Sequence, residues 1–201
     1  MEPEQVIEQF RTTGALLEGH FQLSSGLHST VYLQCALVLQ FPDKAESFAR
    51  AIAESYLDQG IELVASPAIG GIVIGHEVAR ALGARFVWTE RDAGQMTLRR
   101  GFTVSPEEKT LVVEDVITTG GSTRETIEAL KRAGANVVAA SSIIDRSGGT
   151  ADVGVPLSAL ASLRVLSVDP SACDACQSGE PVVKPGSRGP EGVIGCSEFK
   201  L

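Results

Sequence analysis

The sequence predicts an α/β protein: a parallel β-sheet flanked by helices, with a small hood formed by the N-terminal and C-terminal segments. Short apolar runs alternate with amphipathic helical patterns along most of the chain, which is typical of βαβ units. One run, Thr110–Val113, is continuous and rich in β-branched residues, as in a strand covered on both faces. Hydrophobic residues make up 43% and charged residues 21% of the 201 residues, which excludes a disordered chain.

The first sixty residues predict two helices with a pair of strands between them. An amphipathic pattern predicts a helix over residues 3–17. Residues 19–40 alternate in short runs separated by Gly, Ser and His, which predicts strand, turn and strand. After Pro42, apolar residues recur at helical spacing as far as Leu57, and Gly60 ends that helix.

The rest of the chain alternates between strands and helices up to a loop-like tail. The predicted elements are a strand at 61–65, a helix at 72–82, strands at 85–89 and 110–113, a helix at 123–133, and strands at 137–144 and 165–168. The stretch at 90–101 is polar, and the tail from 170 onward shows no helix signal. We expect a single domain over residues 1–201, with a core of about 41–169 and a hood of about 1–40 plus 170–201.

Charge and hydropathy narrow the possible partners and the location. The formal net charge of −8 argues against a protein that grips nucleic acid by its phosphates. No apolar run approaches the roughly 20 residues that a membrane span needs. The N-terminus is acidic and amphipathic, unlike a signal peptide. We therefore expect a cytoplasmic protein with neither nucleic acid nor membrane as a partner.

The four cysteines, in a chain without a secretion signal, indicate a reducing compartment. Cys173 and Cys176 have the spacing of metal ligands, and only Cys196 follows them in a plausible position. All three histidines lie far upstream, at His20, His28 and His76. A structural metal site is one interpretation, but inert thiols in a tail hairpin are the favoured one.

The loop after the strand Thr110–Val113 carries the clearest chemical signal. Its glycines let backbone N–H groups turn toward one point, and hydroxyls of Thr118, Thr119 and Ser122 add donors at a helix N-terminus. This is a phosphate cradle, although a plain capped turn has a similar composition. Glu114 and Asp115 would repel a phosphate, so they suit ribose hydroxyls, with a divalent cation nearby. The loop therefore predicts a binder of ribose 5-phosphate at the carboxyl edge of the sheet.

Several segments together resemble the type I phosphoribosyltransferases, and among them the orotate phosphoribosyltransferases. The signature loop LVVEDVITTGGST is specific for the superfamily, and the flanking segments specify orotate. Those segments are GHFQLSSGLHSTVYLQ, SPAIGG, TERDAGQMTLRRGF, IIDRSGG and CDACQSGEPVVKPGSR. The resemblance extends from about Ala15 to Arg188.

The resemblance implies a reaction and a binding site for its donor substrate. The phosphoribosyl group would pass from 5-phospho-α-D-ribose 1-diphosphate to orotate, giving orotidine 5′-monophosphate and pyrophosphate in de novo pyrimidine biosynthesis. Mg²⁺ would be held mainly through the substrate, and the protein would be a homodimer. The implied donor-binding residues are Glu114, Asp115, Val116, Ile117, Thr118, Thr119, Gly120, Gly121 and Ser122, together with Pro67, Ala68, Ile69, Gly70 and Gly71.

The resemblance also implies how the base would be recognised. Thr118 would border the base, and Arg146 would approach the orotate carboxylate, a role that suits a planar guanidinium. Tyr32 and Leu33 would lie against the pyrimidine ring.

The chain departs from the best-studied members at positions where they carry lysine. Ser24 and Gly70 replace two such lysines. The resemblance implies that the polar stretch 90–101 forms a mobile lid, and Gln95 stands there where a basic residue is expected. The charge of the pyrophosphate must then be met by the metal and by the basic residues of the lid. These residues, assigned here a catalytic role, are Arg91, Arg99 and Arg100.

Two other functions remain as alternatives. A purine phosphoribosyltransferase would share the signature loop but would not need Arg146. A regulator that senses phosphoribosyl diphosphate without catalysis would need an added nucleic-acid-binding surface, which the acidic composition disfavours.

Overall fold

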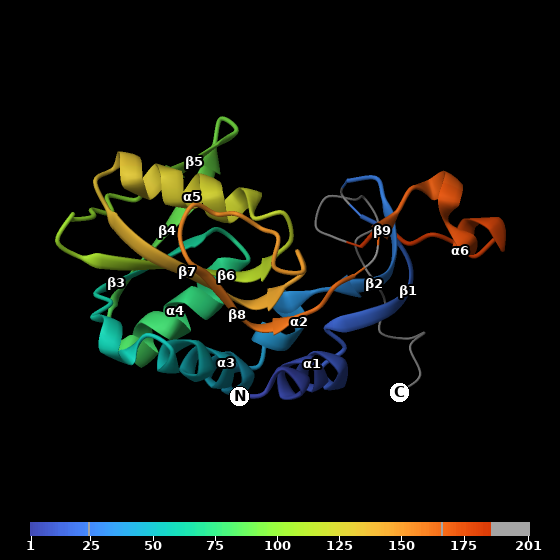
Figure 1. Cartoon of the computed structure of the whole chain (residues 1–201), viewed down its shortest axis with the longest axis horizontal. Helices are drawn as coiled ribbons and strands as arrows, with labels where there is room; N and C mark the ends of the chain where they lie inside the picture. The colour runs from blue at the N-terminus through green and yellow to red at the C-terminus, as the bar shows by residue number, and fades with distance from the viewer. Residues whose placement is uncertain (24, 166, 186–201) are drawn as a thin grey trace. The chain divides into compact units, whose positions relative to one another are not determined.

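The computed structural model describes residues 1–23, 25–165 and 167–185, which group into two compact units (Figure 1). The larger unit contains Met1–Ala15 and Cys35–Arg164, and the smaller contains Leu16–Gln34 and the chain from Val165 onward. Residues 1–15 thus group with the larger unit and not with the expected hood. The reason is that the first helix packs against a strand of the large sheet.

The larger unit is built on a six-stranded sheet with the order β5-β4-β3-β6-β7-β8. Its strands are β3 (Leu63–Pro67), β4 (Arg85–Asp92), β5 (Gln95–Leu98), β6 (Lys109–Ile117), β7 (Asn136–Asp145) and β8 (Leu157–Ser162). All neighbouring pairs are parallel except β4 and β5, which form an antiparallel hairpin. The predicted α/β class with a parallel sheet is therefore confirmed.

Helices cover both faces of this sheet. They are α1 (Pro3–Thr12), α2 (Cys35–Leu39), α3 (Pro42–Glu54), α4 (Gly71–Leu82) and α5 (Gly121–Arg132), with a short 3-10 turn η1 at Leu57–Gln59. Figure 1 shows α5 on one face, with α3 and α4 on the other. None of the helices among the described residues has the length and apolar run needed to cross a membrane.

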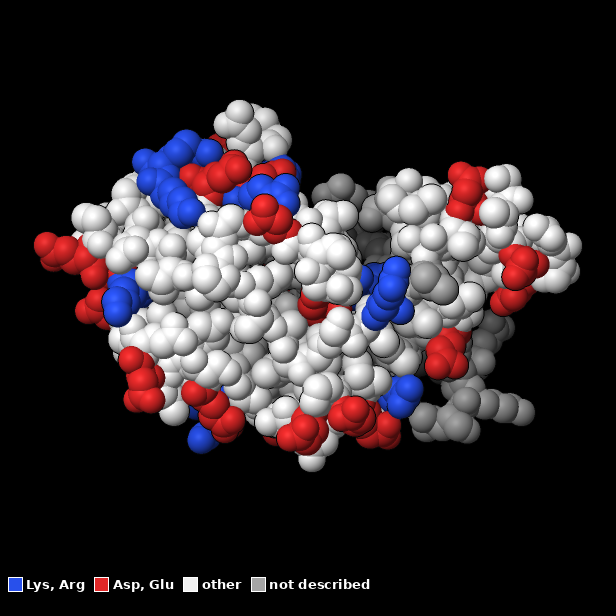
Figure 2. Space-filling model, in the orientation of Figure 1, with Lys and Arg blue, Asp and Glu red and all other residues white. Residues whose placement is uncertain are grey.

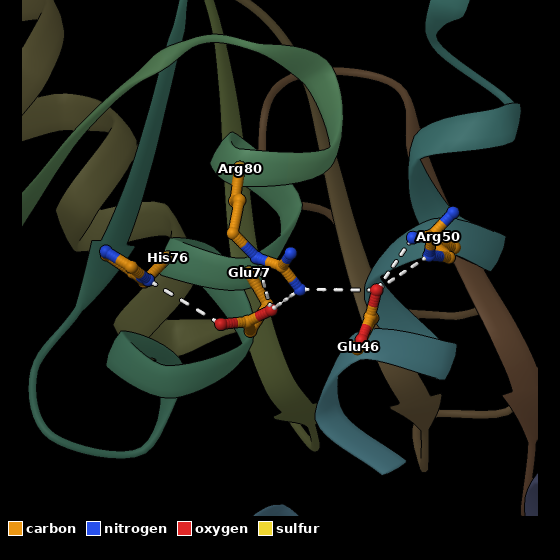
Figure 3. Close-up of polar contacts among 5 residues, drawn as sticks. All are labelled: Glu46, Arg50, His76, Glu77 and Arg80. Atoms are coloured by element: carbon orange, nitrogen blue, oxygen red, sulfur yellow. Dashed lines mark hydrogen bonds and ion pairs between the residues drawn. The ribbon is translucent and has the colours of Figure 1, made fainter. Parts of the chain in front are cut away.

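The helices α3 and α4 are joined at the surface by charged side chains. Glu46 of α3 accepts a 2.7 Å hydrogen bond from Arg50 and lies 3.5 Å from Arg80 of α4, which also pairs with Glu77 (Figure 3). Exposed pairs of this kind contribute about 0–1 kcal/mol each, so the apolar faces beneath them hold the two helices in place.

The strand β6 lies at the centre of the core. Leu111, Val112 and Val113 are all fully buried, as expected for a strand with helices on both faces. Val112 packs in one cluster with Ile127 and Leu130 of α5. The signature loop that follows β6 is therefore anchored on a rigid strand.

The smaller unit is a three-stranded antiparallel sheet, ordered β1-β2-β9, with a short helical segment after it. Its elements are β1 (Leu16–Gln22), β2 (His28–Leu33), β9 (Ser167–Val168), the 3-10 turn η2 (Pro170–Ala172) and α6 (Asp174–Gln177). The segment after α6 returns to β1, where the N–H of Val183 donates to the carbonyl of His20 at 2.8 Å.

Several local expectations were wrong. The first helix ends at Thr12 and not at 17, because Gly14 takes a left-handed conformation (φ 68°) and the next residues enter β1. The expected strand 165–168 is only β9. The tail contains α6, whose four residues are too few to show a helical period. The elements α2, β5 and β8 were not predicted, and β8 (LSALAS) has no β-branched residue to signal a strand.

One reason for disfavouring a metal at Cys173 and Cys176, the distance of the histidines in sequence, does not hold in the folded chain. His20 of β1 and His28 of β2 approach both thiols, although they lie about 150 residues upstream in sequence. Ser24 and Cys196 lie outside the described residues.

The burial of β6 predicts the stability cost of truncating it. Leu111→Ala should lower the free energy of unfolding by about 2–5 kcal/mol, because it leaves a cavity in a packed core. Leu57→Ala is the control: Leu57 is 64% exposed, so its truncation should cost less than about 0.5 kcal/mol. Urea unfolding followed by circular dichroism measures both, and equal midpoints for the two variants would contradict this description of the core.

Candidate functional site

The sheet order reverses between β3 and β6, and both strands end at the same edge. From β3 the chain passes through α4 to β4 on one side, and it later reaches β6 on the other side of β3. Ligands of open α/β sheets bind in the crevice at the carboxyl ends of the strands at such a reversal. The two segments expected to bind the donor substrate, 67–71 and 114–122, begin in the last residues of these two strands, because β6 runs four residues further than predicted, to Ile117.

The loop from β6 to α5 has the geometry of an anion cradle. Gly120 adopts a left-handed conformation (φ 75°), and a Cβ there would lie 2.9 Å from Cγ1 of Val153. Only glycine satisfies both constraints. Thr118, Thr119 and Ser122 are exposed at the N-terminus of α5, where N–H groups and the helix dipole favour an anion.

The loop from β3 to α4 packs directly against the acidic pair. A Cβ on Gly70 would lie 2.9 Å from Oδ2 of Asp115, and one on Gly71 would lie 3.1 Å from Oε1 of Glu114. The absence of both side chains lets the backbone approach the carboxylates. The peptide bond between Ala68 and Ile69 is cis, and Ile69 is 85% exposed.

The acidic pair is held in an unfavourable environment. Burial, reinforced by the charge of Asp115, raises the pKa of Glu114 well above its usual range. Burial also raises the pKa of Asp115, whose Oδ1 accepts a 2.8 Å hydrogen bond from the N–H of Val116. Two adjacent carboxyls that resist ionisation favour a bound cation or hydroxyl groups as partners.

Cys35 is a neighbour of the pair that the sequence did not reveal. It lies on α2 and is buried, close enough to Asp115 for that carboxylate to act on its thiol. Burial and the Asp115 carboxylate raise the pKa of Cys35, and the charge of Arg146 lowers it in part. A cysteine in a short helix that the sequence did not predict carries no local signal of this proximity.

Arg146 emerges at the same edge as the signature loop. In the parallel pairing of β6 and β7, Asp145 lies opposite Ile117, and the N–H of Arg146 donates to the carbonyl of Ile117 at 2.7 Å. The carboxylate of Asp145 accepts N–H bonds from Ser147 and Gly149, which fixes the turn that follows. Arg146 therefore lies at the sheet edge where the sequence predicts it, and its contact with orotate stays a prediction.

Tyr32 and Leu33 lie on β2 of the smaller unit. The ring of Tyr32 is 5.8 Å from the ring of Phe21, and Leu33 is buried. Their contact with a base stays a prediction.

The expected lid is a β-hairpin and not an irregular loop. The strands β4 and β5 are joined by Ala93 and Gly94, both with positive φ, as in the two-residue turns that suit twisted hairpins. Each of the three expected arginines pairs with a carboxylate: Arg91 with Glu125 at 2.6 Å, Arg99 with Asp92 at 3.7 Å and Arg100 with Glu90 at 2.6 Å. Figure 2 shows basic and acidic side chains side by side over β5 and α5.

The raised pKa of Glu114 predicts a pH-dependent stability. In the unfolded chain this carboxyl ionises near its ordinary pKa of about 4.3, whereas in the fold it keeps its proton to higher pH. The unfolded state therefore binds fewer protons above that pH, and stability falls as the pH rises.

Glu114→Gln should remove this penalty. Thermal unfolding of the ligand-free protein between about pH 4 and pH 8 should show the Gln variant gaining in Tm over the original protein as pH increases. Glu107→Gln, at an exposed position, is the control and should show no such trend. A Tm difference for Glu114→Gln that is independent of pH would contradict the assignment.

Comparison with known proteins agrees with this geometry. The profile of the phosphoribosyl transferase domain matches residues 38–156. The orotate phosphoribosyltransferase of Pelotomaculum thermopropionicum is 51% identical over 188 residues, covering 94% of this chain and 99% of the relative. That of Heliobacterium modesticaldum is 50% identical and covers 94% of this chain and 100% of the relative.

Solved structures share the fold. The crystal structure of orotate phosphoribosyltransferase from Aeropyrum pernix superposes with a TM-score of 0.67 at 25% identity, covering 79% of this chain and 94% of that one. Adenine phosphoribosyltransferase from Thermoanaerobacter pseudethanolicus has a TM-score of 0.57 at 15% identity, covering 66% of this chain and 88% of that one, which shows the fold alone. The chain belongs to the phosphoribosyltransferase family and, within it, to the orotate phosphoribosyltransferases.

Proposed function

We propose that the protein transfers the phosphoribosyl group from 5-phospho-α-D-ribose 1-diphosphate to orotate, releasing pyrophosphate and giving orotidine 5′-monophosphate for pyrimidine biosynthesis. The observation that carries the proposal is the acidic pair Glu114-Asp115, placed between an anion cradle and a glycine-bearing loop at the reversal of the sheet order. Relatives half-identical over 94% of the chain carry the name of this activity.

The donor substrate divides between the two loops. Glu114 and Asp115 accept hydrogen bonds from the ribose hydroxyls, and the segment 116–122 binds the 5-phosphate. The segment 67–71 binds the diphosphate. This division is supported by chemistry. Ribose hydroxyls donate hydrogen bonds that stabilise the buried carboxylates, while exposed backbone N–H groups and protein hydroxyls donate to phosphate oxygens.

Mg²⁺ fits this site. The diphosphate oxygens of the substrate would supply most of its ligands, and the nearby carboxylates of Glu114 and Asp115 are hard oxygen donors of the kind that this ion prefers. When bound, the ion would neutralise charge on the leaving pyrophosphate. A nearby cation would stabilise the ionised form of the two carboxyls, whose pKa values are raised by burial.

The chain itself supplies position and electrostatics, without a covalent nucleophile. The sugar centre passes through an oxocarbenium-like state while the bond to pyrophosphate breaks. Bringing the base and the activated sugar together lowers the entropic cost of the reaction. Closure of the β4–β5 hairpin would exclude water, which otherwise hydrolyses the donor.

The lid arginines would act by exchanging partners. Arg91, Arg99 and Arg100 each face a carboxylate at the protein surface, and such pairs hold only about 0–1 kcal/mol. A diphosphate carries more charge than one carboxylate, so it competes effectively for these guanidinium groups.

Family membership and the sequence support two further statements, on assembly and on location. We infer a homodimer from the resemblance alone, and light scattering after size exclusion tests it. A cytoplasmic location is supported by the cysteine usage, because the cysteines of the described residues are free thiols. Heparin retention distinguishes the enzyme, which should not bind, from a nucleic-acid-binding regulator, which should.

The function is tested by following orotate absorbance with phosphoribosyl diphosphate and Mg²⁺, with uracil, hypoxanthine and adenine as competing bases. Consumption of orotate alone supports the proposal. Turnover of a purine in its place would indicate the purine enzyme, and turnover of no base would indicate the regulator.

Replacing the paired lid arginines should slow catalysis. Arg99→Ala/Arg100→Ala should lower kcat/KM by at least about tenfold, roughly 1.4 kcal/mol of transition-state stabilisation. The matched control is Arg50→Ala/Arg80→Ala, which removes two exposed, ion-paired arginines on α3 and α4. Activity of the lid variant within about twofold of the control would contradict the role.

Arg146 should determine the affinity for orotate. A hydrogen bond to a charged group contributes about 1.5–3 kcal/mol, so Arg146→Ala should raise the KM for orotate by about tenfold or more. The KM for phosphoribosyl diphosphate should change much less, because that ligand uses other loops. Arg146→Lys should recover part of the loss, since it restores charge without the bidentate geometry. An unchanged KM for orotate in the Ala variant would refute the assignment.

A further inference from the structure

The smaller unit contains a compact cluster of nitrogen and sulfur ligands. His20, His28, Cys173 and Cys176 each offer one ligand atom, and these atoms all lie within 4.8 Å of one another. His20, His28 and Cys173 are buried, with exposures of 4%, 4% and 6%. The four residues come from β1, β2 and the segment that forms α6.

The spacing matches the edges of a tetrahedral site. With Zn–N of about 2.0–2.1 Å and Zn–S of about 2.3 Å, tetrahedral geometry places N and S ligands about 3.5 Å apart and two N ligands about 3.3 Å apart. Sγ of Cys173 and of Cys176 lie 3.5 and 3.6 Å from Nε2 of His20, and Sγ of Cys176 lies 3.2 Å from Nδ1 of His28. The two imidazole nitrogens are 2.8 Å apart, so a small outward shift completes the geometry.

The β-hairpin explains how two histidines eight residues apart meet. His28 lies opposite Gln22 in the antiparallel register, and Gln22 is two residues from His20. Residues two apart in a strand share a face, so both imidazoles lie on one side of the sheet. A short turn then brings Cys173 and Cys176 over that side.

A second hydrogen bond orients one of the imidazoles. Nδ1 of His20 lies 2.9 Å from the carbonyl oxygen of Glu180. Because a carbonyl only accepts, the ring proton resides on Nδ1 and the lone pair of Nε2 points into the cluster. This arrangement, with the distal nitrogen donating to a backbone carbonyl, is the usual support of a metal-bound histidine.

We propose that Nε2 of His20, Nδ1 of His28 and the two thiolates of Cys173 and Cys176 bind one Zn²⁺ in a closed, tetrahedral, structural site. Four protein ligands leave no open position for a substrate, and a set of two thiolates with two imidazoles is typical of structural zinc. Binding releases the two thiol protons to solvent. This site is chemically distinct from the carboxylate site, whose hard oxygen donors suit Mg²⁺.

The ion would fasten the C-terminal segment to the β1–β2 hairpin. The strand β9 contributes only two residues to the small sheet, and a unit of this size has little core of its own. Small units of this kind commonly depend on a metal or a disulfide. The zinc site would therefore hold the C-terminal segment to the β1–β2 hairpin, which the short strand β9 alone does not do.

The test is the metal content of the untagged full-length chain, purified under reducing conditions and measured by inductively coupled plasma mass spectrometry. About one zinc per chain is expected, with most of it lost in Cys176→Ser and His28→Gln. His76→Gln, which alters an exposed histidine outside the cluster, is the matched control and should retain the metal. Titration of the chelated protein with Co²⁺ should produce the thiolate charge-transfer and tetrahedral d–d absorption bands.

Two results would overturn the proposal. One is a chain that takes up no zinc and shows no cobalt spectrum although its circular dichroism is native. The other is a disulfide between Cys173 and Cys176 in protein prepared under reducing conditions, detected by mass spectrometry after alkylation. The cobalt titration uses the unaltered chain, so it decides the question even where a ligand variant fails to fold.

Discussion

The close approach of the β3–α4 loop to Glu114 and Asp115 is the constraint on which the site depends. No side chain larger than hydrogen fits at Gly70 or Gly71 without meeting a carboxylate. The approach confines two carboxyls with raised pKa values beside a bare backbone loop at the point where the sheet order reverses. Such an arrangement costs folding free energy and is relieved by a polyhydroxylated, cation-associated ligand.

The surrounding fold holds this costly arrangement in place. The acidic pair belongs to β6, in which the preceding residues 111–113 are fully buried, so the carboxylates cannot move into solvent without disturbing the core. The β4–β5 hairpin differs, because its arginines are held by weak surface ion pairs. The acidic pair is held rigidly, whereas the arginines of the hairpin can exchange their carboxylate partners. This combination is well suited to binding a diphosphate and then releasing it.

The features that the sequence predicted are those encoded by contiguous residues or by parallel register. The strand β6, the signature loop and the helix α5 are contiguous in the sequence. The position of Arg146 follows from the rule that parallel strands end at one edge of the sheet. The strands β5 and β8 were not predicted, because they are strands through their pairing with β4 and β7 and not through their composition. The contact of Cys35 with Asp115 and the meeting of His20 with Cys173 join distant segments, and no local pattern reports them.

The most direct measurement is a crystal structure of the protein with phosphoribosyl diphosphate and Mg²⁺. The account predicts the ribose hydroxyls at Glu114 and Asp115, the 5-phosphate at the N-terminus of α5, and the diphosphate along the segment 67–71. The helices α3 and α4 also border a charged hollow that is lined by Glu46, Glu77 and Arg80. Density for the ligand in that hollow, with the edge at β3 and β6 vacant, would contradict the account.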